Sequence, residues 1–159
     1  MNRLLSTLII FTAVLAISPR VALAEWRVIS HANEMRFEMM SAFYDGELIV
    51  LNGFNKDIDL VNSVEVYDPQ NNNWTQLDST EAGLQNAVTH AAYIVVDNEL
   101  WVFGGRVGDH PGPVSDKVWI YHLEEHTWRT GPNLPQPFAG GGAALVNNQI
   151  HLFLSLIHI

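Results

Sequence analysis

The residues with the most evident chemical potential are His122 and His126, which flank Glu124 and Glu125. Two imidazoles four positions apart can hold a metal ion when a helix places them on one face. This stretch shows no helical period and separates two short apolar runs, so we interpret it as a polar turn and predict no metal site. The chain also has no cysteine, which excludes disulfides, thiolate ligands and thiol nucleophiles.

Two longer polar segments, 54–62 and 106–116, hold the other candidates. A cation, a carboxylate and an imidazole occur close together in the second segment as Arg106, Asp109 and His110. Surface loops commonly carry ligand contacts, so we predict that these three residues contribute to binding. No spacing in the chain is typical of a nucleophile with its base, and we predict no catalytic residue and no cofactor.

The elements that must position these residues are short β-strands joined by tight turns. Asp45-Gly46, Asp97-Asn98 and Asn147-Asn148 each separate two short apolar or alternating runs. Gly, Asn and Asp tolerate the positive φ angles of two-residue hairpin turns better than other residues. No window after residue 24 keeps a helical period, so the sequence predicts an all-β fold.

A repeat organises these strands into larger units. An apolar run ends in glycine, a tyrosine follows, and a tryptophan comes seven residues after the tyrosine. The offset between the two copies is 52 residues at the glycine and 54 at the tyrosine and tryptophan. A period near 50 residues with four strands per unit is typical of a β-propeller blade. The residues that carry the repeat are Gly53, Tyr67, Trp74, Gly104, Gly105, Tyr121 and Trp128.

This pattern resembles the kelch repeat. The resemblance implies an incomplete kelch-type β-propeller of about two and a half four-stranded blades, near residues 36–78, 88–130 and 138–153. It also implies that the repeated glycines and aromatic residues are scaffold. Asn52 departs from the pattern, which has a glycine there. Arg36, which would lie near the propeller axis, becomes a fourth candidate binding residue.

The segment 131–142 resembles the links between blades in exported bacterial kelch proteins, which are grouped with the propeller domain of galactose oxidase. The first 24 residues agree with export. A short positive start precedes an uncharged apolar run, Leu4 to Ile17, and small residues precede a cleavage site after Ala24. Fourteen helical residues span about 21 Å, short of the roughly 30 Å of a membrane core. We expect a cleaved signal peptide, no stable membrane anchor, and a periplasmic or extracellular protein.

Both ends of the remaining chain suggest a fragment. Trp26 precedes Leu51 by 25 residues, as Trp128 precedes Phe153, so residues 25–30 are expected to form the outer strand of a closing blade. The other strands of that blade would lie in a C-terminal part that this sequence lacks. Residues 154–159 depart from the repeat and resemble the translation of a sequencing adapter, and we interpret them as a non-native tail.

The charge balance limits the partners. The formal net charge is −9, and removal of Arg3 and Arg20 with the signal peptide would leave 17 acidic residues against 6 basic ones, or −11. Such an excess of acid argues against nucleic-acid binding. We therefore predict a module that binds a protein or a carbohydrate. The alternative is part of a carbohydrate-active enzyme similar to sialate mutarotases or to the oxidase, although the oxidase needs a cysteine that this chain lacks.

Overall fold

A computed structural model describes residues 26–77, 87–108 and 110–154 and confirms the all-β prediction. None of the described residues belongs to a helix that is long and apolar enough to cross a membrane. The strands are β1 (Met40–Tyr44), β2 (Glu47–Leu51), β3 (Val64–Asp68), β4 (Asn73–Gln76), β5 (Val88–Thr89), β6 (Ala92–Val96), β7 (Glu99–Phe103), β8 (Arg106–Val107), β9 (Val118–His122), β10 (Thr127–Thr130), β11 (Gly141–Val146) and β12 (Gln149–Leu154).

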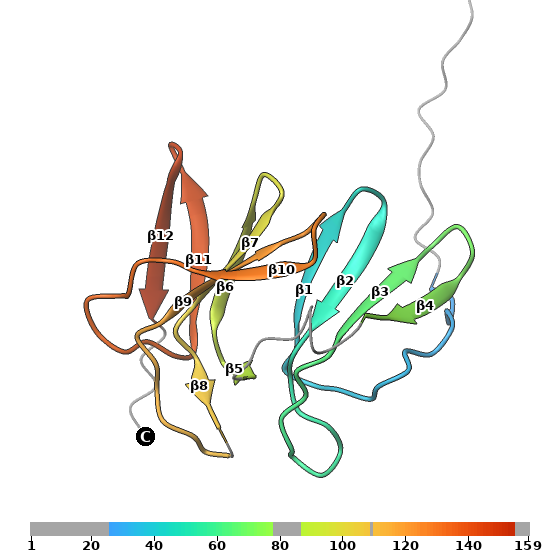
Figure 1. Ribbon diagram of the computed structural model, residues 1–159, viewed down its shortest axis with the longest axis horizontal. Coiled ribbons are helices and arrows are strands. Elements are labelled where there is room, and N and C mark those ends of the chain that lie inside the picture. Colours follow the sequence, from blue (N-terminus) through green and yellow to red (C-terminus); the bar gives the residue numbers. More distant parts are fainter. Residues whose placement is uncertain (1–25, 78–86, 109, 155–159) are drawn as a thin grey trace, which may run out of the picture.

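The strands form two complete four-stranded antiparallel units and one hairpin, which stand side by side (Figure 1). The first unit has the order β1-β2-β3-β4, the second β6-β7-β9-β10, and the hairpin is β11-β12. Two four-stranded units and one hairpin correspond to the two and a half blades that the sequence predicts. One further pair, β5 with β8, has no counterpart in the prediction, because strands of two residues carry no periodic signal.

The hairpin turns lie where the sequence predicts them. Asp45 and Gly46 have φ angles of 46° and 85°, and Asn147 and Asn148 have φ angles of 49° and 63°. Asp97 also has a positive φ, 55°. These turns set the registers of the hairpins β1-β2, β6-β7 and β11-β12, in which Tyr44 pairs with Glu47, Val96 with Glu99 and Val146 with Gln149.

The core lies between consecutive units, as expected of blades that pack face to face. Apolar side chains from β1, β2 and β3 meet those from β7 and β9, whereas the opposite face of the second unit packs against the β11-β12 hairpin. Burial of a large apolar side chain stabilises a fold by about 1.5–3 kcal/mol, so these two interfaces hold the units together. The first interface is formed by Met40, Ala42, Ile49, Leu51, Val64, Val66, Val88, Leu100, Val102, Trp119, Tyr121 and Leu123.

The repeated tyrosine and tryptophan face each other across strands. Tyr67 pairs with Trp74 and Tyr121 with Trp128, with ring centroids 5.1 Å and 4.8 Å apart. Tyr121 is fully buried in the core between the first two units, and this burial raises the pKa of its hydroxyl above the ordinary value. These contacts agree with a scaffold role for the two aromatic pairs.

The glycines that follow β2 and β7 allow close approach of the backbone. Gly105 has a φ of 91°, and a Cβ there would lie 2.7 Å from the carbonyl oxygen of Thr89. Gly53, with a φ of 100°, meets the carbonyl oxygen of Phe37 in the same way, at 2.6 Å. The second glycine of the repeat therefore lets the start of each long loop pack against the segment that leads into the first strand of the same unit.

The chain ends lie partly outside the described residues, which exclude the expected signal peptide and residues 155–159. Residues 26–30 form no strand, and Trp26 is 97% exposed. The prediction of an outer strand at 25–30 requires partner strands from a closing blade and stays a prediction. The strand β12 continues one residue past the expected end, because Leu154 pairs with Gly141.

Candidate functional site

The two long loops open at the same edge of the molecule, opposite the hairpin turns (Figure 1). Each loop begins by pairing with the segment that precedes the first strand of its own unit: Phe54 pairs with Phe37, and Arg106 with Thr89. We call this edge the loop face and define it by segments 37–39, 54–62, 88–91, 106–108 and 110–116. Surface loops on a rigid sheet are where binding residues concentrate.

Phe54 anchors the centre of the loop face. Its side chain is 3% exposed, and its ring lies 5.7 Å from Phe37, 6.5 Å from His90 and 5.8 Å from His110, measured between ring centroids. The contacts with both histidines are edge-on, which is a favourable arrangement for aromatic rings. Phe54 thus links the loops of the first two units.

Three equivalent residues that lead into the first strand of each unit have left-handed backbone conformations. They are Glu38, His90 and Gly140, with φ angles of 54°, 55° and 70°. The amide of Gly140 donates a hydrogen bond of 2.8 Å to the carbonyl oxygen of His90, which ties two of these positions together. A glycine is the ordinary residue for such a position. Holding a glutamate and a histidine there costs on the order of 1–3 kcal/mol each, a pattern that clusters at functional sites.

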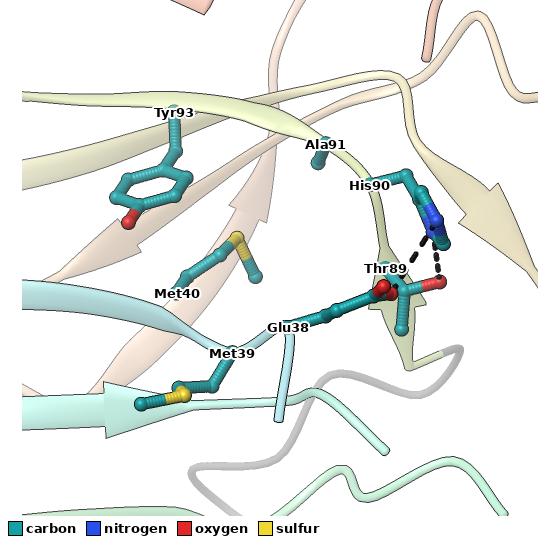
Figure 2. Close-up of a pocket in the computed structure, with 7 residues that line it drawn as sticks. All are labelled: Glu38, Met39, Met40, Thr89, His90, Ala91 and Tyr93. Atoms are coloured by element: carbon teal, nitrogen blue, oxygen red, sulfur yellow. Dashed lines mark hydrogen bonds and ion pairs between the residues drawn. The ribbon is translucent and has the colours of Figure 1, made fainter. Parts of the chain in front are cut away.

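Glu38 and His90 meet across the gap between the first two units. The Oε2 atom of Glu38 lies 3.4 Å from Nε2 of His90, and Nδ1 of His90 lies 3.1 Å from the hydroxyl of Thr89. Figure 2 shows the Glu38 side chain reaching from its own segment toward Thr89 and His90. The carboxylate and imidazole form an ion pair only when the imidazole is protonated.

A cavity of about 280 Å³ opens beside this pair. Met39 and Met40 line it from the first unit, and Ala91 and Tyr93 from the second (Figure 2). The lining residues are Glu38, Met39, Met40, Thr89, His90, Ala91 and Tyr93. The site therefore combines one carboxylate and one imidazole at the rim with a mainly apolar wall.

Two of the four predicted binding residues hold polar contacts within the chain. The guanidinium of Arg106 donates hydrogen bonds of 2.9 Å and 2.8 Å to the carbonyl oxygens of Pro111 and Gly112, so it braces its own loop. The side chain of Arg36 is 3% exposed and lies 2.7 Å from a carboxylate oxygen of Glu65, which is also buried. The structure thus gives both arginines intramolecular partners.

The other two predicted residues differ in what the structure shows. His110 is exposed on the loop face, with its ring against Phe54. Asp109 lies outside the described residues.

In the part of the chain that the structure describes, no group of three or more histidine or acidic residues is placed to hold a metal. His122 contacts the Asn98 amide at 2.8 Å, and His126 contacts the Tyr121 hydroxyl at 3.1 Å.

The Glu38–His90 pair was not predicted from the sequence. The two residues are 52 positions apart, and a glutamate does not indicate a left-handed backbone. An alignment of the repeats could have indicated this position. It places Glu38, His90 and Gly140 at one equivalent position, and the glycine there indicates a positive φ.

Comparison with known proteins agrees with this architecture. A family model described as the kelch motif matches residues 35–80 and 87–135, which together make up more than half of the chain. Kelch-like protein 25 of Xenopus tropicalis is 36% identical over 89 residues, covering 56% of this chain and 14% of that protein. Beta-scruin of Limulus polyphemus is 25% identical over 135 residues, covering 81% of this chain and 14% of that protein.

A kelch domain-containing protein of the archaeon Sulfurisphaera tokodaii is 27% identical over 99 residues, covering 62% of this chain and 13% of that protein. The chain therefore spans about a seventh of the length of each of these relatives. The repeated glycine, tyrosine and tryptophan, the four-stranded units and the two matched segments lead to one conclusion. This chain belongs to the kelch-repeat family.

Proposed function

We propose that this protein is an exported kelch propeller that acts as a binding module and recognises a protein ligand at the loop face. The single observation that carries the proposal is the set of exposed apolar side chains on this edge. Phe37, Met39, Ile58 and Val114 are 45%, 43%, 50% and 37% exposed, respectively, and all lie in segments of the loop face. Methionine and aromatic residues are enriched at protein interfaces, and the four side chains come from three segments of this one edge.

Export is the second part of the proposal. It is supported by the three-part pattern of residues 1–24 and by the resemblance of segment 131–142 to the links of exported bacterial propellers of the galactose-oxidase type. Cleavage after Ala24 is tested by N-terminal sequencing of the protein recovered from its host. A mature chain that begins at Glu25 outside the cytoplasm is expected, and an uncleaved cytoplasmic chain would contradict export.

The binding proposal is tested by affinity capture with matched variants. The protein is immobilised and exposed to extracellular proteins of its host, and captured proteins are quantified by mass spectrometry. A double variant of the loop face, Ile58→Ser with Val114→Ser, should capture at least about tenfold less partner than the unmodified protein. A tenfold loss corresponds to the removal of contacts worth about 1.4 kcal/mol.

The control is a double variant at the opposite edge, Glu124→Ala with Glu125→Ala, which changes two exposed side chains in the β9-β10 turn. It should capture as much partner as the unmodified protein. Equal capture by the loop-face variant would refute the proposed surface. A glycan array run in parallel identifies the ligand class. Specific binding to a glycan, with no captured protein, would show that the ligand is a carbohydrate and not a protein.

A further inference from the structure

We propose that the cavity beside Glu38 receives the side chain of a lysine on the partner protein. This inference rests on the proposed protein-binding function and specifies one contact within it. The cavity joins the first two units at the loop face, so a side chain that enters it would contact both units at once. Its size, charge and lining each point to an alkylammonium group.

The size of the cavity suits one side chain. The cavity measures about 280 Å³, near the lower end of the roughly 300–1,000 Å³ of small-molecule pockets, so it has room for one long side chain. Met39, Met40 and Ala91 provide apolar surface for the four methylene groups of a lysine, and the Tyr93 ring projects from β6 toward the same space (Figure 2). Lysine commonly buries its aliphatic stem against apolar surface while its ammonium keeps polar contacts.

The charge at the rim favours a cation. The Glu38 side chain is 45% exposed, and its ionic contact is with His90. Among the described residues, no lysine or arginine forms an ion pair with Glu38. Arg36, Lys56, Lys117 and Arg129 lie against Glu65, Asp57, Asp116 and Glu99, and Arg106 is bonded to backbone carbonyls.

Two further features select an ammonium over other groups. The formal charge of −9 attracts basic partners and repels acidic ones. A guanidinium has five donors in a fixed fork, and one carboxylate accepts two of them, whereas Glu38 is the one carboxylate among the lining residues and the Thr89 hydroxyl already contacts His90. A compact ammonium is satisfied by Glu38 and can also lie against the face of the Tyr93 ring.

The test uses the methionines as reporters. The chain has four, of which Met39 and Met40 line the cavity, whereas Met35 is 70% exposed and does not line it. The full chain, labelled with ¹³C at the methionine methyl groups, is titrated with n-butylammonium, which reproduces a lysine side chain, and with 1-butanol, its neutral counterpart. We expect n-butylammonium to shift the Met39 and Met40 signals, to leave Met35 unchanged, and to bind at least about tenfold more tightly than 1-butanol.

Glu38→Gln keeps the shape of the side chain and removes its charge, and it should abolish that tenfold preference. Glu124→Gln removes the same charge at the opposite edge and should preserve it. Equal binding of the two probes, shifts of all three methionines, or an equal loss in both variants would overturn the inference. Near-UV circular dichroism of each variant verifies that the fold is retained.

A last comparison identifies the source of the ammonium and separates this inference from the proposed function. The peptide acetyl-Gly-Lys-Gly-amide should bind more tightly than its norleucine analogue, which lacks the ammonium group. If spermidine binds more tightly than the lysine peptide, the inference that the ammonium comes from a protein is wrong. If Glu38→Gln captures the protein partner normally while the loop-face double variant does not, the lysine contact is wrong and the proposed function stands. If neither variant affects capture, both fail.

Discussion

Gly105 illustrates how strictly single residues are constrained where each loop leaves its unit. The position needs a left-handed backbone, with φ of 91°, and also lacks room for a side chain, because a Cβ would lie 2.7 Å from a carbonyl oxygen and 3.0 Å from the Cβ of Ala91. Gly108 has a similar φ, 76°, but a Cβ at that position would meet no other atom within 4 Å. A comparison of the two positions therefore distinguishes the cost of the backbone conformation from the cost of crowding.

Gly105→Ala should lower the free energy of unfolding by about 1–3 kcal/mol more than Gly108→Ala does, because overpacking adds to a backbone cost common to both variants. Urea denaturation of the two variants measures the difference. Equal losses would show that crowding at Gly105 is relieved without cost and that the close backbone approach does not hold the loop strand in place.

Asp68, at the β3-β4 turn, makes a pH-dependent contribution to the stability of the fold. The side-chain amide of Asn71 and the backbone amide of Gln70 donate hydrogen bonds to its carboxylate and lower the pKa of Asp68 below its ordinary value. A carboxyl with a lower pKa in the folded state stabilises the fold above the pKa of the unfolded chain. This stabilisation is lost as the pH falls through the folded-state pKa.

The expected outcome is that Asp68→Asn removes this part of the acid sensitivity, and that Asn71→Ala raises the pKa of Asp68 toward its ordinary value. Carboxyl carbon shifts followed by NMR across the acidic range measure the pKa directly. An unchanged pKa in Asn71→Ala would contradict the assigned cause.

At the scale of elements, the first unit is joined to the segment before it by a buried ion pair. Arg36 donates to Glu65 and Ser63, and the amides of Asn33 and Glu34 also donate to the Glu65 carboxylate. In the second unit the equivalent positions hold Val88 and Trp119, both buried and apolar. The same structural position is thus filled by charge in one unit and by apolar packing in the next.

Arg36→Met should therefore destabilise the protein by about 3–5 kcal/mol, because it leaves the Glu65 carboxylate buried without its cation. Adding Glu65→Gln removes that charge and retains an oxygen to accept from the Asn33 and Glu34 amides, so the double variant should be more stable than Arg36→Met alone. Urea denaturation tests the order, and a double variant less stable than the single one would show that the charge is not the cause.

The strands and turns could be predicted from the sequence more fully than the contacts of the candidate site. The hairpins were predictable because Asp45-Gly46 and Asn147-Asn148 favour one turn geometry, and the units because the Tyr67–Trp74 pattern returns as Tyr121–Trp128. The β5-β8 pair and the Glu38–His90 contact depend on how separate segments approach each other, which no local pattern encodes. The residue type made Arg106 a candidate for binding, and the structure adds that its guanidinium donates to two carbonyl oxygens of its own loop.

At the scale of the whole molecule, the repeat explains both the fold and the location of the candidate site. Each unit places its hairpin turns at one edge and its long loop at the other, so repetition gathers variable residues on the loop face (Figure 1). The buried interfaces between units fix the loops relative to one another. Variation at equivalent positions, as in Glu38, His90 and Gly140, then sets the chemistry of that edge.

The central claim, that the loop face is the binding surface, is tested most directly by hydrogen–deuterium exchange of the protein alone and saturated with its captured partner. We expect slower exchange in segments 54–62, 88–91 and 106–116, with the turns at 45–46, 97–98 and 124–126 unchanged. Protection confined to those turns, with unchanged exchange across the loop face, would contradict the account.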